Sequence, residues 1–322
     1  MSPTWTEAVV VARHDPTPRI AVFELARTDG AELWDYEPGA HIDVQAGGTG
    51  LIRQYSLCGP PGTRKQYRLA VLNERASRGG SRAMHALAEG DTVLISAPRN
   101  RFSLTPARRH VLLAGGIGIT PLLAMALALD ADGGDYHLHY CARSRTEAAF
   151  VTELENNPRV SFHFDDGPAD QHLDLARDAG PPDPDTALYA CGPAGFMDHV
   201  LGRAAHLGWP PSALHMERFA AAAAVAGPDT GTPGSGAFTV RLASTGAEYT
   251  IAGEETILDV LLANGVDAPY SCRQGICGEC VVRVLAGEPD HQDDVLTEAE
   301  RADGMFTLCS SRSHSPILEV DL

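Results

Sequence analysis

Residues 270–280 read Tyr270-Ser271-Cys272-Arg273-Gln274-Gly275-Ile276-Cys277-Gly278-Glu279-Cys280. Three thiols in this stretch, Cys272, Cys277 and Cys280, have the spacing C-x4-C-x2-C, and Cys309 follows after 28 further residues. This is the plant-type spacing for a [2Fe–2S] cluster, in which four cysteine thiolates hold the irons. The pattern therefore predicts that Cys272, Cys277, Cys280 and Cys309 are metal ligands in a C-terminal iron–sulfur domain.

A zinc site is the alternative for four cysteines. Structural zinc sites usually show pairs of ligands two to four residues apart, with a long gap between the pairs. A loop with three cysteines and one distant cysteine fits that arrangement poorly. Ser271, Gly275 and Gly278 are small or polar, so the loop can wrap closely and present backbone N–H groups to the sulfurs. The [2Fe–2S] interpretation is therefore favoured.

The residues around this loop predict a small mixed domain. Residues 238–242 alternate in polarity as a half-buried strand does, and 249–251 can pair with them. Residues 256–264 predict a helix, with Thr256 and Asp259 as a capping box and Gly265 at its C′ position. Further predicted elements are strand 281–285, helix 297–302 and strand 317–320. Over its whole length this segment resembles a plant-type ferredoxin domain with a β-grasp fold.

Length and composition restrict the classes of protein to which the chain can belong. Its 322 residues have room for two or three domains. With 42 acidic and 25 basic residues the net charge is −17, which repels nucleic acids and anionic membranes and favours partners with a basic docking face. The chain lacks a run of about 18 apolar residues. Its first residues lack the features of a signal peptide, so we expect a cytoplasmic protein.

Residues 8–102 predict an antiparallel β-barrel. Short β-rich segments alternate with turns that contain Gly, Pro or Asp. One short helix, at 81–87, interrupts them. The predicted strands are 8–12, 20–25, 41–44, 53–57, 67–72 and 92–96.

Two segments of this barrel suit an anionic cofactor. In Arg53-Gln54-Tyr55-Ser56-Leu57, alternate residues share one face of a strand, so a cation and an aromatic ring lie side by side. In Arg75-Ala76-Ser77-Arg78-Gly79-Gly80-Ser81, two arginines precede a helix start with Ser81 as its predicted N-cap, which indicates an anion site. Taken alone, the first segment is also compatible with an ordinary strand, and the second with a flexible basic loop.

In residues 108–217 the sequence pattern changes to that of an α/β domain with a parallel sheet. The continuous apolar run 111–114 is typical of a buried parallel strand. Strands and helices then alternate, as they do in α/β domains. The predicted elements that follow are helix 122–129, strand 136–141, helix 146–154, strand 160–164, strand 187–190 and helix 194–204.

A glycine turn follows the first of these strands. Gly115-Gly116-Ile117-Gly118-Ile119-Thr120-Pro121 leads into a helix, with Thr120 as its predicted cap and Pro121 at its first position. A strand, a glycine turn and a helix start together form a cradle for a pyrophosphate, although Pro121 stands where a Rossmann motif has its third glycine. Cys191-Gly192-Pro193 follows the last strand. Both segments lie where nucleotides bind in open α/β sheets.

The order of these motifs is similar to that in the ferredoxin–NADP reductase superfamily. Residues 38–42, 53–57 and 90–93 resemble its flavin barrel, and the two glycine segments resemble its nucleotide half. The Gly79-Gly80-Ser81 loop with its preceding arginine resembles the FMN-binding branch. With the ferredoxin module at its C-terminus, the whole chain resembles the phthalate dioxygenase reductase-type family of class IA oxygenase reductases.

This resemblance implies roles for the barrel residues. Arg53 and Ser81 hold the flavin phosphate, and Tyr55 packs along the isoalloxazine. Ser56 lies near flavin N5, where the hydride arrives, and is an expected catalytic residue. FMN is expected rather than FAD, because nothing in the sequence supplies an adenine site. The expected flavin-binding residues are Arg53, Gln54, Tyr55, Ser56, Leu57, Ala70, Val71, Gly79, Gly80 and Ser81.

The resemblance implies further roles in the nucleotide half. Cys191 lies near the nicotinamide and is the second expected catalytic residue, while Glu217 and Phe219 approach the flavin. Residues 143–145 follow the second strand, where the adenosine ribose or phosphate is bound. Two arginines there are compatible with NADPH, but this branch uses NADH, which we expect. The expected binding residues here are Gly116, Gly118, Thr120, Pro121, Arg143, Ser144, Cys191, Gly192, Pro193 and Phe219.

The motifs divide the chain into four segments. Residues 220–236 are rich in Ala, Gly, Pro and Thr without periodicity, which is typical of a linker. The expected segments are an FMN-binding β-barrel at 1–105, an NAD(P)H-binding α/β domain at 106–219, the linker at 220–236 and a [2Fe–2S] ferredoxin domain at 237–322.

The resemblance implies an NADH-dependent reductase that passes electrons through FMN and the cluster to a terminal oxygenase. NADH delivers two electrons together whereas a cluster accepts one, so the flavin divides the pair. The expected electron acceptor is a Rieske non-haem iron oxygenase that catalyses aromatic hydroxylation or O-demethylation. A cytochrome P450 is the alternative acceptor. A redox sensor without turnover is the alternative from another class. We expect a monomer with no nucleic-acid or membrane partner.

Overall fold

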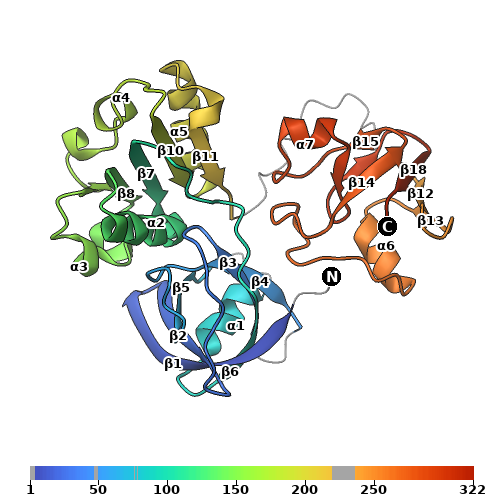
Figure 1. Cartoon of the computed structure of the whole chain (residues 1–322), viewed down its shortest axis with the longest axis horizontal. Coiled ribbons are helices and arrows are strands. Elements are labelled where there is room, and N and C mark those ends of the chain that lie inside the picture. The colour runs from blue at the N-terminus through green and yellow to red at the C-terminus, as the bar shows by residue number, and fades with distance from the viewer. Residues whose placement is uncertain (1–3, 47–49, 76, 78, 220–235) are drawn as a thin grey trace. The chain divides into compact units, whose positions relative to one another are not determined.

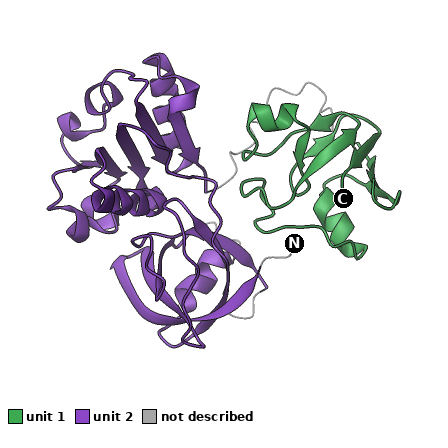
Figure 2. Cartoon of the chain, in the orientation of Figure 1, with its two compact units in different colours: residues 1–2, 220–322 green, residues 3–219 purple. Residues whose placement is uncertain are grey.

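The computed structural model describes residues 4–46, 50–75, 77, 79–219 and 236–322 (Figure 1). These residues divide into two compact units, one within residues 3–219 and the other within residues 220–322 (Figure 2). The expected linker lies outside the described residues except for Gly236, and so does Arg78 of the basic loop. Among the described helices, none is long and apolar enough to cross a membrane.

The larger unit begins with a six-stranded antiparallel sheet, as the sequence predicts. Its order is β4-β3-β6-β1-β2-β5, and a bridge between Leu57 and Leu69 links the end of β4 to β5, which closes the sheet into a barrel. Alternating apolar side chains such as Phe23, Leu25 and Ile42 fill its interior. The strands are β1 (Trp5–Thr17), β2 (Ile20–Arg27), β3 (His41–Ala46), β4 (Ile52–Ser56), β5 (Tyr67–Leu72) and β6 (Thr92–Ser96).

Helix α1 (Gly80–Ala86) follows the basic loop and differs from the prediction at its N-terminus. Ser81 is not the N-cap, because Gly79 occupies that position with a φ of 109°, which residues with a Cβ rarely adopt. Ser81 lies in the first turn, and its Oγ accepts a hydrogen bond from the backbone N–H of Glu74 (3.2 Å). The glycine pair therefore determines where this helix begins.

A parallel five-stranded sheet forms the second part of the larger unit. Its order is β11-β10-β7-β8-β9, so the chain leaves the central β7 in both directions and creates a topological switch point between β7 and β10. The strands are β7 (Arg109–Gly115), β8 (Tyr136–Ala142), β9 (Val160–Phe164), β10 (Thr186–Cys191) and β11 (Leu214–Glu217). The helices are α2 (Ile119–Asp132), α3 (Val151–Leu154), α4 (Leu175–Asp178) and α5 (Ala194–His206).

Two local predictions in this part are wrong. Thr120 does not cap α2, since the N-cap is Gly118 and Thr120 Oγ1 donates to the carbonyl of Ile117 (3.0 Å). Residues 146–154 do not form one helix, because Phe150 has a left-handed φ of 61° directly before α3. Such a residue interrupts the right-handed helical path. Only a 3₁₀ turn and one turn of α-helix remain there.

The barrel and the parallel sheet share one continuous hydrophobic core. Ile20 and Ala70 of the barrel belong to the same buried cluster as side chains of α2 and β8. Arg68 adds a polar connection, since its guanidinium donates to both carboxylate oxygens of Glu153 (3.0 and 3.1 Å) and lies over the ring of Phe150. This packing explains why the two parts form one compact unit.

The smaller unit is a mixed sheet with the β-grasp arrangement that was predicted. Its order is β13-β12-β18-β14-β16, in which only β12 and β18 pair in parallel. Helix α6 buries Ile257, Leu258 and Leu261 in the core, and Thr256 caps it by accepting from the N–H of Asp259 (3.0 Å). The elements are β12 (Phe238–Leu242), β13 (Glu248–Ile251), α6 (Ile257–Ala263), β14 (Val281–Ala286), β15 (Pro289–Asp290), α7 (Glu298–Ala302), β16 (Met305–Thr307), β17 (Arg312–Ser313) and β18 (Ile317–Val320).

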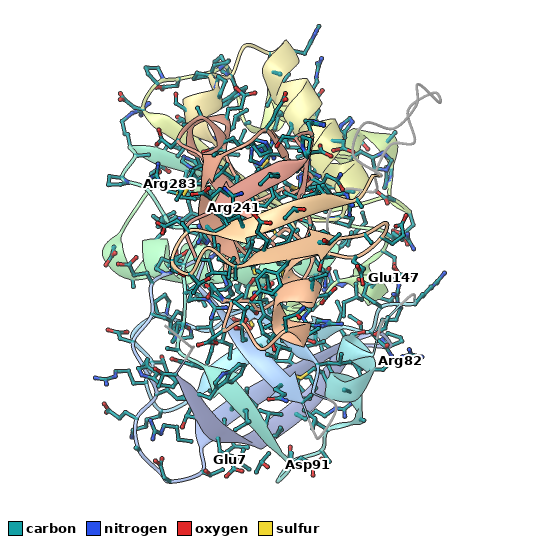
Figure 3. All side chains as sticks on the ribbon, turned by 90° about the vertical axis from the view of Figure 1, so that its right-hand side faces the viewer. Glu7, Arg82, Asp91, Glu147, Arg241 and Arg283 are labelled. Atoms are coloured by element: carbon teal, nitrogen blue, oxygen red, sulfur yellow. The ribbon has the colours of Figure 1, made fainter. Side chains whose placement is uncertain are left out.

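Charged side chains cover the solvent side of this sheet. Arg241 on β12, labelled in Figure 3, forms ion pairs with Glu248 on β13 (2.7 Å) and Glu319 on β18 (3.5 Å). Exposed pairs of this kind contribute only about 0–1 kcal/mol. The buried face of the sheet, packed against α6, therefore stabilises this unit.

Candidate functional site

Four buried thiols converge in the smaller unit. Cys272, Cys277 and Cys280 lie in the segment between α6 and β14, and Cys309 follows β16. Each of the four is at most 5% exposed. The thiol of Cys272 interacts with those of Cys277 and Cys309, and the thiol of Cys309 interacts with that of Cys280. Four convergent sulfurs shielded from water fit the donor set of a [2Fe–2S] cluster.

Backbone N–H groups of the cysteine loop point at these sulfurs. The N–H of Gln274 donates to Cys272 Sγ and that of Gly275 to Cys309 Sγ, both at 3.2 Å. Such hydrogen bonds tune the reduction potential of a cluster. Gly275 has a φ of 73°, and a Cβ there would lie 2.5 Å from Ser310 Oγ. Glycine is therefore needed at this position for the loop to close around the sulfurs.

A buried carboxylate, that of Asp293, supports this loop and was not predicted from the sequence. Asp293 accepts a hydrogen bond from Ser311 Oγ (3.3 Å) and forms an ion pair with Arg301 (3.4 Å). The N–H of the adjacent Asp294 donates to the carbonyl of Gly275 (3.0 Å). These partners come from separate segments, so no local pattern in the sequence marks Asp293.

In the larger unit, Arg53 of β4 lies in contact with Gly80, the first residue of α1. A Cβ at Gly80 would fall 2.4 Å from Arg53 Cγ and 2.9 Å from its Nε, so the arginine side chain crosses directly over the glycine. A guanidinium beside bare backbone fits an anionic group such as a phosphate. Burial raises the pKa of the nearby Tyr55, whose phenol therefore remains protonated.

Ser56, Glu217 and Cys191 come together from three strands. Glu217, the last residue of β11, pairs in register with Cys191, the last residue of β10. Ser56, at the end of β4, donates from its Oγ to Glu217 Oε2 (3.3 Å). Burial raises the pKa of the Cys191 thiol well above its ordinary value, so this cysteine is a neutral thiol. The barrel thus meets the parallel sheet at the carboxyl ends of β10 and β11.

Glu217 has the most perturbed carboxyl group of this junction. The residue is half-buried, but its carboxyl group is enclosed. Burial raises its pKa to about 8, and the hydrogen bond from Ser56 lowers it only in part. Glu217 therefore holds a proton at neutral pH.

We expect Glu217→Gln to remove a pH-dependent part of the stability. The carboxyl group ionises near 4.5 in the unfolded chain but near 8 in the folded chain. Stability from this group is therefore fully present below pH 4.5 and is lost as the pH rises through 8. The loss is at most about 5 kcal/mol, since each pKa unit represents ~1.4 kcal/mol. Urea unfolding across this range should show a steeper fall for the wild type than for the variant, and parallel curves would contradict the assignment.

The two glycine segments of the parallel sheet touch at the switch point. A Cβ at Gly118 would fall 2.2 Å from the carbonyl oxygen of Cys191 and 2.6 Å from the nitrogen of Gly192. The ring of Phe196, which the sequence analysis missed, covers both Gly115 and Gly192, where a Cβ would lie 2.7 and 2.6 Å from it. Gly116 of the same turn has no atom within 4 Å of where a Cβ would lie, so this open backbone fits a pyrophosphate.

The remaining expected binding residues occupy positions of several kinds. Leu57, Ala70 and Val71 are buried in apolar cores, so only their backbone groups are available to a cofactor. Gln54 Nε2 donates to Asp43 Oδ1 (3.2 Å) within the barrel. Buried positions in the first turn of α2 are Thr120 and Pro121, and Gly116 precedes it. The exposed positions are Arg143, Pro193 and Phe219, while Ser144 is half-buried.

Comparisons with known proteins agree with this architecture. Residues 240–313 match the 2Fe-2S iron-sulfur cluster binding domain family. The chain is 47% identical to a vanillate O-demethylase oxidoreductase of Pseudomonas sp. (strain HR199 / DSM 7063), over 98% of this chain and 99% of that protein. The solved structure of a phthalate dioxygenase reductase matches all of both chains at 34% identity, with a TM-score of 0.73. An intact type IV self-sufficient cytochrome P450 monooxygenase matches at 39% identity with a TM-score of 0.84, covering 99% of this chain and 41% of that one.

A barrel joined to a nucleotide-type parallel sheet, together with a four-thiol ferredoxin unit, defines an NAD(P)H-dependent flavin and iron–sulfur oxidoreductase. More narrowly, the chain belongs to the phthalate dioxygenase reductase-type family, whose members are reductase components of oxygenase systems. The resemblance, the fold class and the reductase function expected from the sequence are thereby confirmed.

Proposed function

We propose that this protein takes electrons from NADH, passes them through FMN and the [2Fe–2S] cluster, and delivers them singly to a Rieske non-haem iron oxygenase. The junction of Ser56 with Glu217 and Cys191 carries the proposal, because it joins the barrel to the carboxyl ends of the sheet. Bound FMN supplies the conversion from two-electron to one-electron transfer. In this proposal the barrel at 1–105 binds FMN, 106–219 binds NADH, 220–236 connects the units and 237–322 holds the cluster.

Each residue of the junction has its own part in this proposal. Ser56 would present its Oγ to the reacting edge of the flavin, and the hydrogen bond that it donates to Glu217 holds that oxygen in position. Cys191 is fully buried and neutral, so it excludes water from the nicotinamide without adding charge. Glu217 holds a proton in the enclosed junction at neutral pH.

We expect Arg53→Ala to weaken FMN binding by about tenfold to a hundredfold, because a hydrogen bond to a charged group contributes about 1.5–3 kcal/mol. Arg53 is the cation that crosses Gly80. Arg82→Ala is the matched control, since Arg82 on α1 is exposed and donates to the carbonyl of Ser77 (2.8 Å). Fluorescence titration of flavin-free protein measures both. Equal affinity of the Arg53 variant and the wild type would contradict this role.

The identity of the flavin has a direct test. Heat or acid releases a non-covalent flavin from purified protein, and chromatography distinguishes FMN from FAD. The proposal expects FMN, and recovery of FAD would refute it.

NADH is proposed as the donor because the charges near the adenosine position favour it. Arg145 forms an ion pair with Glu155, so one of the two arginines is already engaged. The N–H of Asp166 donates to the carbonyl of Arg143 (3.1 Å), which places an acidic residue beside the other. A carboxylate disfavours the 2′-phosphate that distinguishes NADPH. A higher kcat/KM for NADH than for NADPH supports the proposal, and the reverse order contradicts it.

The acceptor separates the proposal from its alternatives. The vanillate O-demethylase relative supports an oxygenase component, whereas the P450 match supports a P450. NADH-dependent product formation with a Rieske oxygenase, but not with a P450, supports the first. Turnover with the P450 alone supports the second. A redox sensor predicts negligible steady-state reduction of ferricyanide, so rapid NADH oxidation with that acceptor excludes it.

A further inference from the structure

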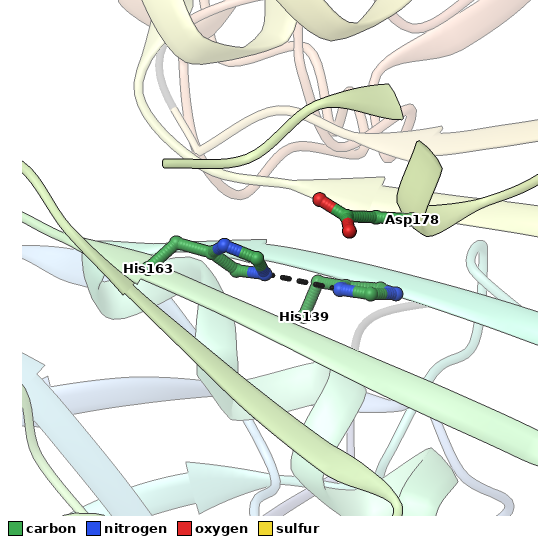
Figure 4. A group of neighbouring side chains, drawn as sticks. All are labelled: His139, His163 and Asp178. Carbon is green, nitrogen blue, oxygen red and sulfur yellow. Dashed lines mark hydrogen bonds between the residues drawn. The ribbon is translucent and has the colours of Figure 1, made fainter. Parts of the chain in front are cut away.

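Two histidines and an aspartate come together in the parallel sheet, outside the sites described above. His139 on β8 and His163 on β9 lie on the sheet, and Asp178 is the last residue of α4. One possible ligand atom from each of the three lies within 4.8 Å of the other two. Figure 4 shows the two imidazoles facing each other, with the carboxylate beside them. The histidines are only 3% and 6% exposed.

These histidines lie where a polar part of the sheet face, with His137 and Ser161, meets the apolar cluster beneath α4. His139 pairs in register with Leu113 of β7, and Leu113 belongs to the buried cluster that Leu175 of α4 completes. A polar group buried on such a face costs free energy unless it has a partner. Burial, followed by the neighbouring His137 and His163, lowers the pKa of His139 to about 3. Burial also lowers the pKa of His163, so both imidazoles are in the neutral form that binds metals.

The two imidazoles are joined by a hydrogen bond, which a bound ion would replace. His163 Nδ1 lies 2.8 Å from the carbonyl oxygen of Gln171, so Nδ1 carries the proton and Nε2 carries the lone pair. That Nε2 accepts a hydrogen bond from His139 Nδ1 (3.0 Å), so the proton of His139 lies between the two rings. In the described part of the chain, His139 Nε2 has no hydrogen-bond partner, so the proton can move from Nδ1 to Nε2 when an ion takes its place. Two nitrogens at this separation can share one ion at the usual Zn–N distance of about 2.0–2.1 Å.

The carboxylate of Asp178 is held in a fixed orientation. Arg177 donates to Oδ1 through Nε (2.7 Å) and to Oδ2 through Nη2 (2.9 Å), and the N–H of Asp174 donates to Oδ2 (2.8 Å). Partners of this kind orient metal-binding carboxylates. The side chain of Asp178 is 12% exposed, which gives an ion a route from solvent.

We propose that His139, His163 and Asp178 bind a zinc ion that fastens α4 to β8 and β9. Two neutral imidazoles and one carboxylate are the nitrogen and oxygen donors that zinc takes, and a water molecule on the exposed side of Asp178 completes four-coordination. The ion replaces the proton shared by the two imidazoles and takes a carboxylate that Arg177 already holds in place. The site is independent of the four thiols and of the electron path.

The test uses the full-length protein with its iron–sulfur cluster intact, because free thiols would themselves take zinc. After loading with zinc and desalting, the wild type should retain one zinc for every two irons by elemental analysis. X-ray absorption at the zinc edge should show nitrogen and oxygen neighbours at about 2.0–2.1 Å and no sulfur at about 2.3 Å. Sulfur neighbours, or no retained zinc, would overturn the proposal.

Variants assign the ion to these residues. His163→Gln and Asp178→Asn should each weaken zinc binding by at least about tenfold to a hundredfold. Loss of a residue that only hydrogen-bonds to a metal ligand already has an effect of this size. His137→Gln, two positions before His139 on β8, should keep the ion. Asp178 is partly exposed, so its asparagine variant keeps the test valid if the His163 variant fails to fold. Zinc should raise the unfolding temperature of the wild type and of the His137→Gln variant, but not that of the His163→Gln or Asp178→Asn variant. An Asp178→Asn variant that retains as much zinc as the wild type would contradict the assignment.

Discussion

Cys277→Ser is expected to abolish electron delivery to the oxygenase while leaving NADH-dependent reduction of ferricyanide intact. Cys277 is 5% exposed, and its Sγ accepts the N–H of Glu279 (3.5 Å), so the serine would replace a shielded sulfur with oxygen. Iron in these clusters prefers soft thiolates. The visible absorption of the cluster should therefore disappear. Ferricyanide reduction should persist, because all four ligands lie in the smaller unit and the proposed flavin site lies in the larger one.

Cys141→Ser is the matched control for this change. Cys141 lies on β8 of the larger unit, is not one of the four ligands and is half-buried. Its variant should keep the cluster absorption and the electron delivery. Two outcomes would contradict the account: a cluster that survives in Cys277→Ser, or a Cys277 variant that also loses ferricyanide reduction.

Gly118→Ala is expected to slow the reduction of the flavin by NADH about a hundredfold. A displacement of the reacting groups by about 1 Å lowers a reaction rate by about this factor. The added Cβ would lie 2.2 Å from the oxygen and 2.4 Å from the carbon of the Cys191 carbonyl. Both are backbone atoms, so no change of rotamer relieves the clash. The strand end that carries Cys191 must move away from the glycine turn, and the proposed nicotinamide position moves with it.

Stopped-flow mixing with NADH measures this rate, and Gly202→Ala provides the control. Gly202 lies within α5, and a Cβ there meets no atom within 4 Å. That variant should reduce its flavin at the wild-type rate and gain up to about 1 kcal/mol from the better helix propensity of alanine. A wild-type rate in Gly118→Ala would show that the glycine contact does not position the nucleotide.

The modules were predictable because each has a strong local signature. The spacing of Cys272, Cys277 and Cys280 indicates one kind of cluster, and the continuous apolar run before Gly115 indicates a buried parallel strand. Both signals depend on residues that are neighbours along the chain. They therefore remain readable without knowledge of the tertiary structure.

Other features depend on tertiary contacts or on backbone conformation, and the sequence misled or was silent there. Ser81 and Thr120 have the residue types of helix caps, yet glycines precede both helices and take the cap positions. The hydrogen bond between Ser56 and Glu217 joins residues 161 positions apart. The resemblance indicated that both approach the flavin, but only the structure shows that they bond to each other. The cluster of His139, His163 and Asp178 was not predicted, since its members come from three separate elements.

The central claim is that electrons reach the cluster only through the flavin. The most direct measurement is electron paramagnetic resonance of the reduced cluster after anaerobic addition of NADH to protein from which the flavin has been removed. The account predicts no signal from the flavin-free protein and a full signal once FMN is added back. A reduced cluster in the flavin-free protein would contradict it.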